Sequence, residues 1–271
     1  MSISGRESMM RAMHKSCFCP TCGVKYSQER STRMAFKLLN CTHRHCVFTI
    51  DEELRHFFLE DRSLLNCLFR AVQSVILRMF NKMNQSQNFV PGFICVLHTF
   101  GRPLEWNPHI HCILSEGGFS DNAIWRPVKH FNYTYLRNAF QTALLNEMEQ
   151  HIGPSFKKIK AYIYHKDKNG FYVYAKPNLC DPNTVIKYIG RYLGRPVIAL
   201  KRIDSYDGEN VTFHYNRHED NAYVKRTIPA IEFIKLLIQH IPEKHFKMIR
   251  YYGLYAVSYT HLRAHETSLH L

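Results

Sequence analysis

Residues 106–114, WNPHIHCIL, organise the chain: a turn leads into a short apolar strand that carries two histidines. Side chains two positions apart on a strand point to the same face of a sheet. His109 and His111 can therefore present two imidazoles to one metal ion while Ile110 packs behind them. The alternative is that both are ordinary, half-exposed histidines of an amphipathic strand.

The composition indicates a globular protein with a polyanionic partner. The chain has 271 residues, 45% of them hydrophobic, a formal net charge of +14 and a pI near 9.4. Such a charge favours nucleic acid over a membrane, because no basic amphipathic anchor stands out. No run of about eighteen apolar residues and no secretory signal is present, so we expect a cytoplasmic protein. Its nine cysteines are better interpreted as buried thiols or metal ligands than as disulfides.

The N-terminal segment carries half of a zinc-knuckle pattern. Cys19-x-x-Cys22 has the spacing at which a tight turn lets two thiolates bind one zinc ion. A complete site needs four ligands, and the candidate partners are His14, Cys17, Cys41 and Cys46. The alternative is a truncated remnant with free thiols.

A second His-x-His pair precedes the first predicted helix. Residues 41–50 indicate a strand, and Asp51 is placed to cap the helical segment that follows, where apolar residues recur at helical spacing to about Met83. His43 and His45 flank an arginine instead of an apolar anchor. We therefore predict a structural or DNA-contacting role for them.

The strand with His109 and His111 is expected to be half of a long-looped hairpin. Pro91-Gly92 predicts a turn into a buried strand over 93–100, and 101–105 then connects the two strands. This pairing makes His98 or Glu105 the candidate third metal ligand, although His98 could equally be a hydrogen-bonded sheet residue. Further on, we expect a helix over 133–151 and a hairpin made of 159–165 and 170–175.

A later helix carries two tyrosines. Asp181 caps it, Pro182 takes its first position, and Gly194 with Pro196 ends it. Tyr188 and Tyr192 lie four residues apart, so their hydroxyls project from one face, although aromatic packing would produce the same spacing. Basic residues suited to DNA phosphates lie beside them: Lys187, Arg191 and Arg195. Strands over 197–203, 211–215 and 223–228 and a helix over 230–240 are expected to follow.

Together the histidine pair, the tyrosine pair and the basic charge fit metal-assisted transesterification at a DNA phosphate. A divalent cation (Mg²⁺ or Mn²⁺) would polarise the phosphate. Tyrosine, with a pKa of about 10, is a good leaving group, so a phosphotyrosine link can be resealed by a DNA 3′-hydroxyl without ATP. Two tyrosines permit two successive strand transfers on single-stranded DNA.

The chain resembles the IS91 group of insertion-sequence transposases, two-tyrosine members of the HUH endonuclease superfamily. The matching words are HRHCVFTI (43–50), PGFICVLHTFGRPLEWNPHIHCILSEGG (91–118), YAKPNLCDPNTVIKYIGRYLGRPVIA (174–199), VTFHY (211–215) and FKMIRYYGLYA (246–256). The resemblance covers roughly residues 14 to 256. It implies that His109 and His111 bind the metal, that Tyr188 and Tyr192 are catalytic, and that CPTCG (19–23) belongs to a zinc-binding segment. That segment departs from the family pattern, because upstream cysteines are missing and His14 stands about where one is expected.

We therefore predict an α+β protein with the HUH endonuclease fold, in which helices pack on a central antiparallel sheet. The expected parts are a partial zinc-binding segment (1–40), the two-tyrosine transposase domain (41–256) and an adaptor-like, non-native tail (257–271), in a chain truncated at both ends. The predicted activity is single-strand nicking and strand transfer in rolling-circle transposition. The alternatives are a non-catalytic DNA-binding remnant and a rolling-circle replication initiator or relaxase.

Overall fold

The computed structural model describes residues 38–83, 89–120, 124–128, 131–179 and 197–256. These residues form two units, each with its own sheet. One unit contains residues 38–98, 107–179 and 245–256, and the other contains 99–106 and 197–244. Strand β2 (Phe89–Phe100) ends in the second unit and strand β3 (Trp106–Ser120) begins there, so the turn between them belongs to it.

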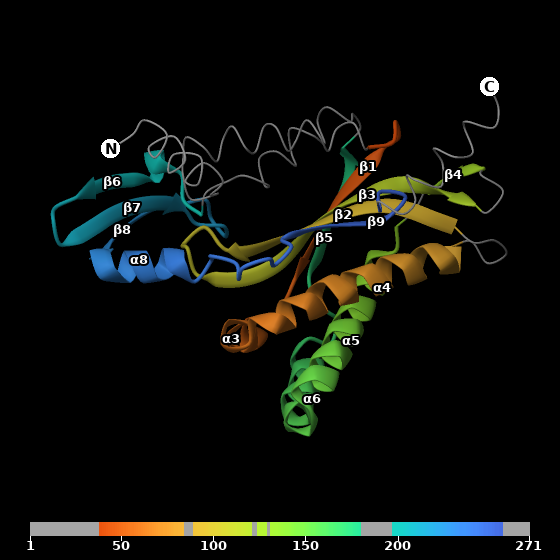
Figure 1. Cartoon of the computed structure of the whole chain (residues 1–271), viewed down its shortest axis with the longest axis horizontal. Coiled ribbons are helices and arrows are strands. Elements are labelled where there is room, and N and C mark those ends of the chain that lie inside the picture. The colour runs from red at the N-terminus through yellow and green to blue at the C-terminus, as the bar shows by residue number, and fades with distance from the viewer. Residues whose placement is uncertain (1–37, 84–88, 121–123, 129–130, 180–196, 257–271) are drawn as a thin grey trace, which may run out of the picture. The chain divides into compact units, whose positions relative to one another are not determined.

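The larger unit is built on a six-stranded sheet with the order β5-β1-β3-β2-β9, to which β4 adds beside β3 (Figure 1). Its strands are β1 (His43–Thr49), β2 (Phe89–Phe100), β3 (Trp106–Ser120), β4 (Trp125–Pro127), β5 (Val173–Leu179) and β9 (Ile249–Gly253). The pairs β1–β3, β1–β5, β2–β9 and β3–β4 are antiparallel. The prediction of an α+β protein with an antiparallel sheet is therefore confirmed.

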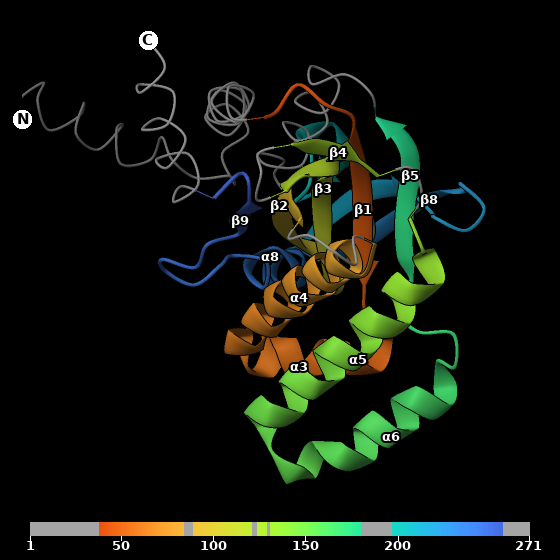
Figure 2. The ribbon, with the colours of Figure 1, turned by 90° about the vertical axis from the view of Figure 1, so that its right-hand side faces the viewer.

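Helices lie on one side of this sheet (Figure 2). They are α3 (Arg55–Glu60), α4 (Leu65–Met83), α5 (Tyr133–Ile152) and α6 (Lys157–Lys166), with α6 on the far side of α5 from the strands (Figure 2). Alternation along the central strands explains the layering: Phe48 and Ile110 are cross-strand partners, both fully buried, and the ring of Phe48 meets that of Phe140 on α5 edge to face at 5.1 Å. Residues of the opposite alternation lie on the other face, and these include the histidines.

Helix α4 and its short lead-in, Arg62–Lys82, are long and apolar enough by length and composition to cross a membrane. Most of its apolar side chains are instead buried within the unit, among them Leu68, Phe69, Val72 and Ile76. Such burial is what a core helix of a folded domain requires. The predicted helical region is confirmed. It is divided in two at Asp61, which ends α3 and caps the start of the next helical segment.

Two local predictions were wrong. Pro91 and Gly92 lie inside β2 instead of in a turn, because the chain needs a residue without a side chain there: a Cβ on Gly92 would come within 2.8 Å of the Tyr255 ring. The expected strand over 159–165 is helix α6. Its buried residue Ile163 lies seven positions, or two helical turns, after the buried Phe156 at the N-cap, so the apolar spacing serves a helix face.

The smaller unit is a three-stranded antiparallel sheet with one helix. Its elements are β6 (Ile203–Tyr206), β7 (Asn210–Asn216), β8 (Tyr223–Pro229) and α8 (Ala230–Ile238). Leu104, at the tip of the β2–β3 turn, packs in the core of this unit with Phe213 and Phe233. The last two predicted strands and the last predicted helix are confirmed. The expected strand over 197–203 is wrong: residues 197–199 are irregular, Leu200–Arg202 form a 3-10 helix, and β6 begins only at Ile203.

Candidate metal centre

The strand β3 presents His109 and His111 on the sheet face away from the helices. The intervening Ile110 and the following Cys112 are fully buried on the helix side. This alternation follows from the period of two along a strand. The geometry expected from the His-x-His spacing is thus present, with the ring nitrogens Nε2 of the two histidines 3.1 Å apart.

A third histidine joins the pair from the neighbouring strand. His98 on β2 lies with its ring centroid 4.4 Å from that of His111 and 5.6 Å from that of His109. One ring nitrogen of each histidine falls within 4.8 Å of the others, as required of ligands to one ion. Among the described residues this is the one group of three or more such side chains that could hold a metal.

Glu105, the other candidate third ligand, is not a member of this group. It is exposed on the turn between β2 and β3, where Gly101 N–H donates to its carbonyl oxygen at 3.2 Å. Of the two candidates that the sequence left open, the structure therefore brings only His98 to the pair.

The surroundings keep the histidine pair neutral. Burial lowers the pKa of His109, and burial together with the neighbouring His98 and His109 lowers that of His111. A neutral imidazole has a free lone pair, whereas a protonated one cannot bind a metal. At pH 7 both rings are therefore in the form that coordinates a cation.

Hydrogen bonds select which nitrogen each ring presents. His109 Nδ1 donates to the backbone carbonyl of Asn107 at 2.7 Å, which leaves its Nε2 lone pair free. Nδ1 of His111 lies 2.9 Å from Nε2 of His45, and these two rings are parallel within 5°. Partners of this kind fix the tautomer and orientation of metal-binding histidines. The geometry leaves Nε2 of His109 and Nε2 of His111 directed at a common point.

His45 is the residue whose place the sequence did not reveal. It was predicted to be structural or to contact DNA, and it lies on β1, where it is 4% exposed and hydrogen-bonded to His111. Burial lowers the pKa of His45 to about 4, so it too is neutral. The signal was the second His-x-His pair, but only the register of β1 against β3 shows which of its histidines approaches the first pair.

Comparison with known proteins gives two family models in order along the chain. Residues 4–50 match the model "Transposase zinc-binding domain", and residues 92–262 match the model "Putative transposase", which by itself covers more than half of the chain. The chain belongs to the IS91 family of transposases.

Two curated relatives agree with this assignment. The IS91-family chain is 28% identical over 251 residues to the transposase for insertion sequence element IS801 of Pseudomonas savastanoi pv. phaseolicola. It is 30% identical over 256 residues to "Putative transposase y4qJ" of Sinorhizobium fredii. The alignments cover 88% and 87% of this chain but only 60% and 64% of these relatives. No solved structure matches the chain significantly.

Several predicted site residues of this IS91-family chain lie outside the described residues. They are the tyrosines Tyr188 and Tyr192, the basic residues Lys187, Arg191 and Arg195, and the zinc-ligand candidates His14, Cys19 and Cys22. Their roles stay predictions.

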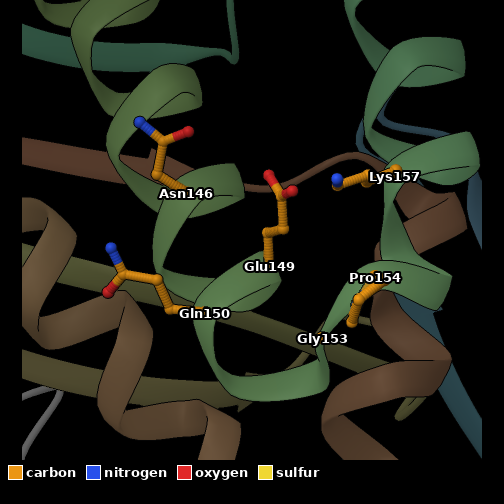
Figure 3. A pocket seen from close by; sticks show the side chains of 6 residues that line it. All are labelled: Asn146, Glu149, Gln150, Gly153, Pro154 and Lys157. Atoms are coloured by element: carbon orange, nitrogen blue, oxygen red, sulfur yellow. The ribbon is translucent and has the colours of Figure 1, made fainter.

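A surface pocket elsewhere does not provide a rival site. It lies where α5 ends and α6 begins, and Figure 3 shows the side chains that line it: Asn146, Glu149, Gln150, Gly153, Pro154 and Lys157. Glu149 is held by an ion pair with Lys160 at 2.6 Å. No histidine or cysteine lines this pocket, so the candidate centre stays with the three histidines.

Proposed function

We propose that this chain carries the nicking and strand-transfer centre of an IS91-family transposase, with an HUH endonuclease fold that acts on single-stranded DNA by a rolling-circle route. The observation that carries the proposal is the cluster of His98, His109 and His111 on two adjacent strands. The net charge of +14 supports a DNA substrate, since a phosphate backbone needs cationic neighbours.

The three histidines would hold a divalent ion. When bound, the ion polarises a non-bridging oxygen of the scissile phosphate. All three donors are imidazole nitrogens, which bind first-row transition metals better than Mg²⁺, a cation that prefers oxygen. Of the two expected metals, the donor set therefore favours Mn²⁺. His45 and the carbonyl of Asn107 contact the two β3 imidazoles and would keep them oriented to bind such an ion.

The proposed nucleophile is the phenol oxygen of Tyr188 or Tyr192. It forms a bond to phosphorus while the bond from phosphorus to the 3′-oxygen breaks, and the phenolic proton ends on that oxygen. The products are a 5′-phosphotyrosine and a free 3′-hydroxyl, and attack by another 3′-hydroxyl reverses the step. Lys187, Arg191 and Arg195 are proposed to contact neighbouring phosphates.

A covalent adduct tests the proposal. The protein is incubated with labelled single-stranded DNA from an element end, with Mn²⁺ or Mg²⁺, and resolved on a denaturing gel. We expect a shifted protein–DNA band that EDTA abolishes, that His109→Ala reduces at least 100-fold, and that is lost in the Tyr188→Phe, Tyr192→Phe double variant. A band that persists in the double variant would overturn the nucleophile assignment.

The two alternatives give different results. A non-catalytic remnant binds DNA without forming an adduct, and neither EDTA nor His109→Ala changes its affinity. A replication initiator or relaxase forms the same adduct, but on a replication or transfer origin instead of on the element end.

A further inference from the structure

We propose that Tyr172 and Tyr174 form a stacking platform for unpaired DNA bases beside the metal centre. The two side chains are 56% and 41% exposed, so both rings are open to a ligand. The proposal deepens the proposed function, on which it rests: it names the part of the surface that would select a single strand as substrate.

The strand register places both tyrosines on the histidine face of the sheet. Residues directly opposite on antiparallel strands share a face. Across β3, β1 and β5, one row is His111, Val47 and Tyr174. In the next row His109 pairs with Thr49, and Thr49 N–H donates to the carbonyl of Tyr172, the residue just before β5, at 3.2 Å. Each step to a neighbouring strand is about 4.8 Å, so the tyrosines begin about 10 Å from the metal-binding strand. A DNA strand held at the histidines would therefore pass over them within a few nucleotides.

The exposure of the two tyrosines is fixed by their neighbours. Phe171 and Val173 alternate with them along the chain and are each 2% exposed on the helix side, where Phe171 meets the ring of Phe140 at 6.0 Å. Anchoring these two side chains in the core turns the tyrosines outward. Tyr174 lies on β5 and Tyr172 just before it. In the sheet order β5 is an edge strand, and β1 is its one neighbour among the described strands.

The turn before the tyrosines is held against helix α5. Gly170 has a φ of +76°, and a Cβ there would lie 2.5 Å from the backbone carbon of Arg137. In the same place, Gln141 of α5 donates to the carbonyl of Asp167 at 3.0 Å. These contacts fix the start of β5, so the platform is preorganised and stacking costs little ordering entropy.

A cation accompanies the aromatic rings. The guanidinium carbon of Arg137 lies 5.4 Å from the centroid of the Tyr172 ring, within the range of a cation–π contact. Its Nε is buried, and no hydrogen-bond partner for it is found among the described residues. Exposed aromatic rings beside arginine on a basic protein are the chemistry of single-strand binding, in which bases stack and phosphates are neutralised. The platform is therefore assigned to bases of unpaired DNA.

Binding without metal separates the platform from the nicking chemistry. We would titrate fluorescently labelled oligo-dT with the full chain in EDTA and record anisotropy for wild type, Tyr172→Ala, Tyr174→Ala and the two Tyr→Phe variants. Each alanine variant should weaken binding roughly 5- to 100-fold, whereas each phenylalanine variant keeps the ring and should bind like wild type. Tyr162→Ala removes a tyrosine that is 52% exposed on α6 and serves as the matched control.

The salt dependence and the adduct assay complete the test. The alanine variants should leave the slope of log Kd against log salt unchanged, because stacking releases no counterions. Wild-type affinity in both alanine variants, with the adduct intact, would overturn the platform and leave the proposed function standing. If the alanine variants bind more weakly but wild type forms no adduct, the platform would stand and the proposed function would be overturned. An adduct lost in Tyr174→Phe would make Tyr174 a nucleophile and overturn the proposal.

Discussion

At the scale of single residues, the candidate metal centre depends on which ring nitrogen each histidine presents. His109 Nδ1–H donates to the carbonyl of Asn107, and His111 Nδ1 lies 2.9 Å from Nε2 of His45, which orients the His111 ring. His45 is in direct contact with His111, to which it is hydrogen-bonded and against which its ring is stacked. A buried imidazole in this position can hydrogen-bond to the neighbouring histidine and orient it, which a hydrophobic residue of similar size could not do.

His45→Ala should weaken Mn²⁺ binding by about 10- to 100-fold, because the His111 ring loses its orienting partner. His45→Gln should recover part of this loss, since its amide oxygen can accept from His111 Nδ1–H. Isothermal titration of the metal-free protein measures both affinities. The control is His43→Ala, two residues away on the same strand, whose ring contacts Tyr255 and no metal-binding histidine. Equal affinity in wild type and His45→Ala would contradict the orienting role.

At the scale of elements, helix α6 shows where a sequence pattern predicts the wrong secondary structure. In residues 159–165, IKAYIYH, apolar and polar residues alternate much as in a strand, yet they form a helix because Phe156 and Ile163 dock on one face. Helix α5 was predicted nearly to its ends; it has 20 residues, and its cap Asn132 accepts from Tyr135 N–H. Short segments are decided by tertiary packing, whereas long periodic ones are not.

Gly170→Ala should destabilise the larger unit by about 2 to 4 kcal/mol. The new methyl group would meet the backbone of α5, and an alanine at positive φ is strained in addition. Urea denaturation followed by circular dichroism measures the change in unfolding free energy. Asn169→Ala, at the exposed neighbouring position of the same turn, should stay within about 0.5 kcal/mol of wild type. Equal stability of the two variants would show that the turn does not need glycine.

At the scale of the whole molecule, the sequence identified the pair His109 and His111 of the candidate centre. It gave the third ligand only as a choice of two residues. The His-x-His spacing determined the face shared by His109 and His111, because a strand has a strict period of two. It could not choose between His98 and Glu105, or place His45, because the order β5-β1-β3-β2-β9 is a property of long-range pairing. Residues that are far apart in sequence become neighbours only through that order.

The chain is expected to bind two metals through different chemistries. The match to a zinc-binding domain over residues 4–50 and the predicted ligands Cys19 and Cys22 call for a thiolate-bound zinc, whereas the sheet offers only imidazoles. Purified Cys19→Ser, Cys22→Ser protein should lose about one zinc per chain by elemental analysis and keep its Mn²⁺ affinity. Zinc that instead disappears with His109→Ala would assign it to the sheet.

Strand β9 is synthesised after the β2–β3 hairpin, which carries the three clustered histidines. β9 covers the outer edge of β2, with Leu97 N–H donating to the carbonyl of Met248 and Tyr252 stacked on Phe93. A ribosome releases β2 and β3 long before residues 249–253, so this edge leaves the exit tunnel with its backbone groups unpaired. The edge of the nascent hairpin therefore stays open to pairing with other strands until β9 has been made.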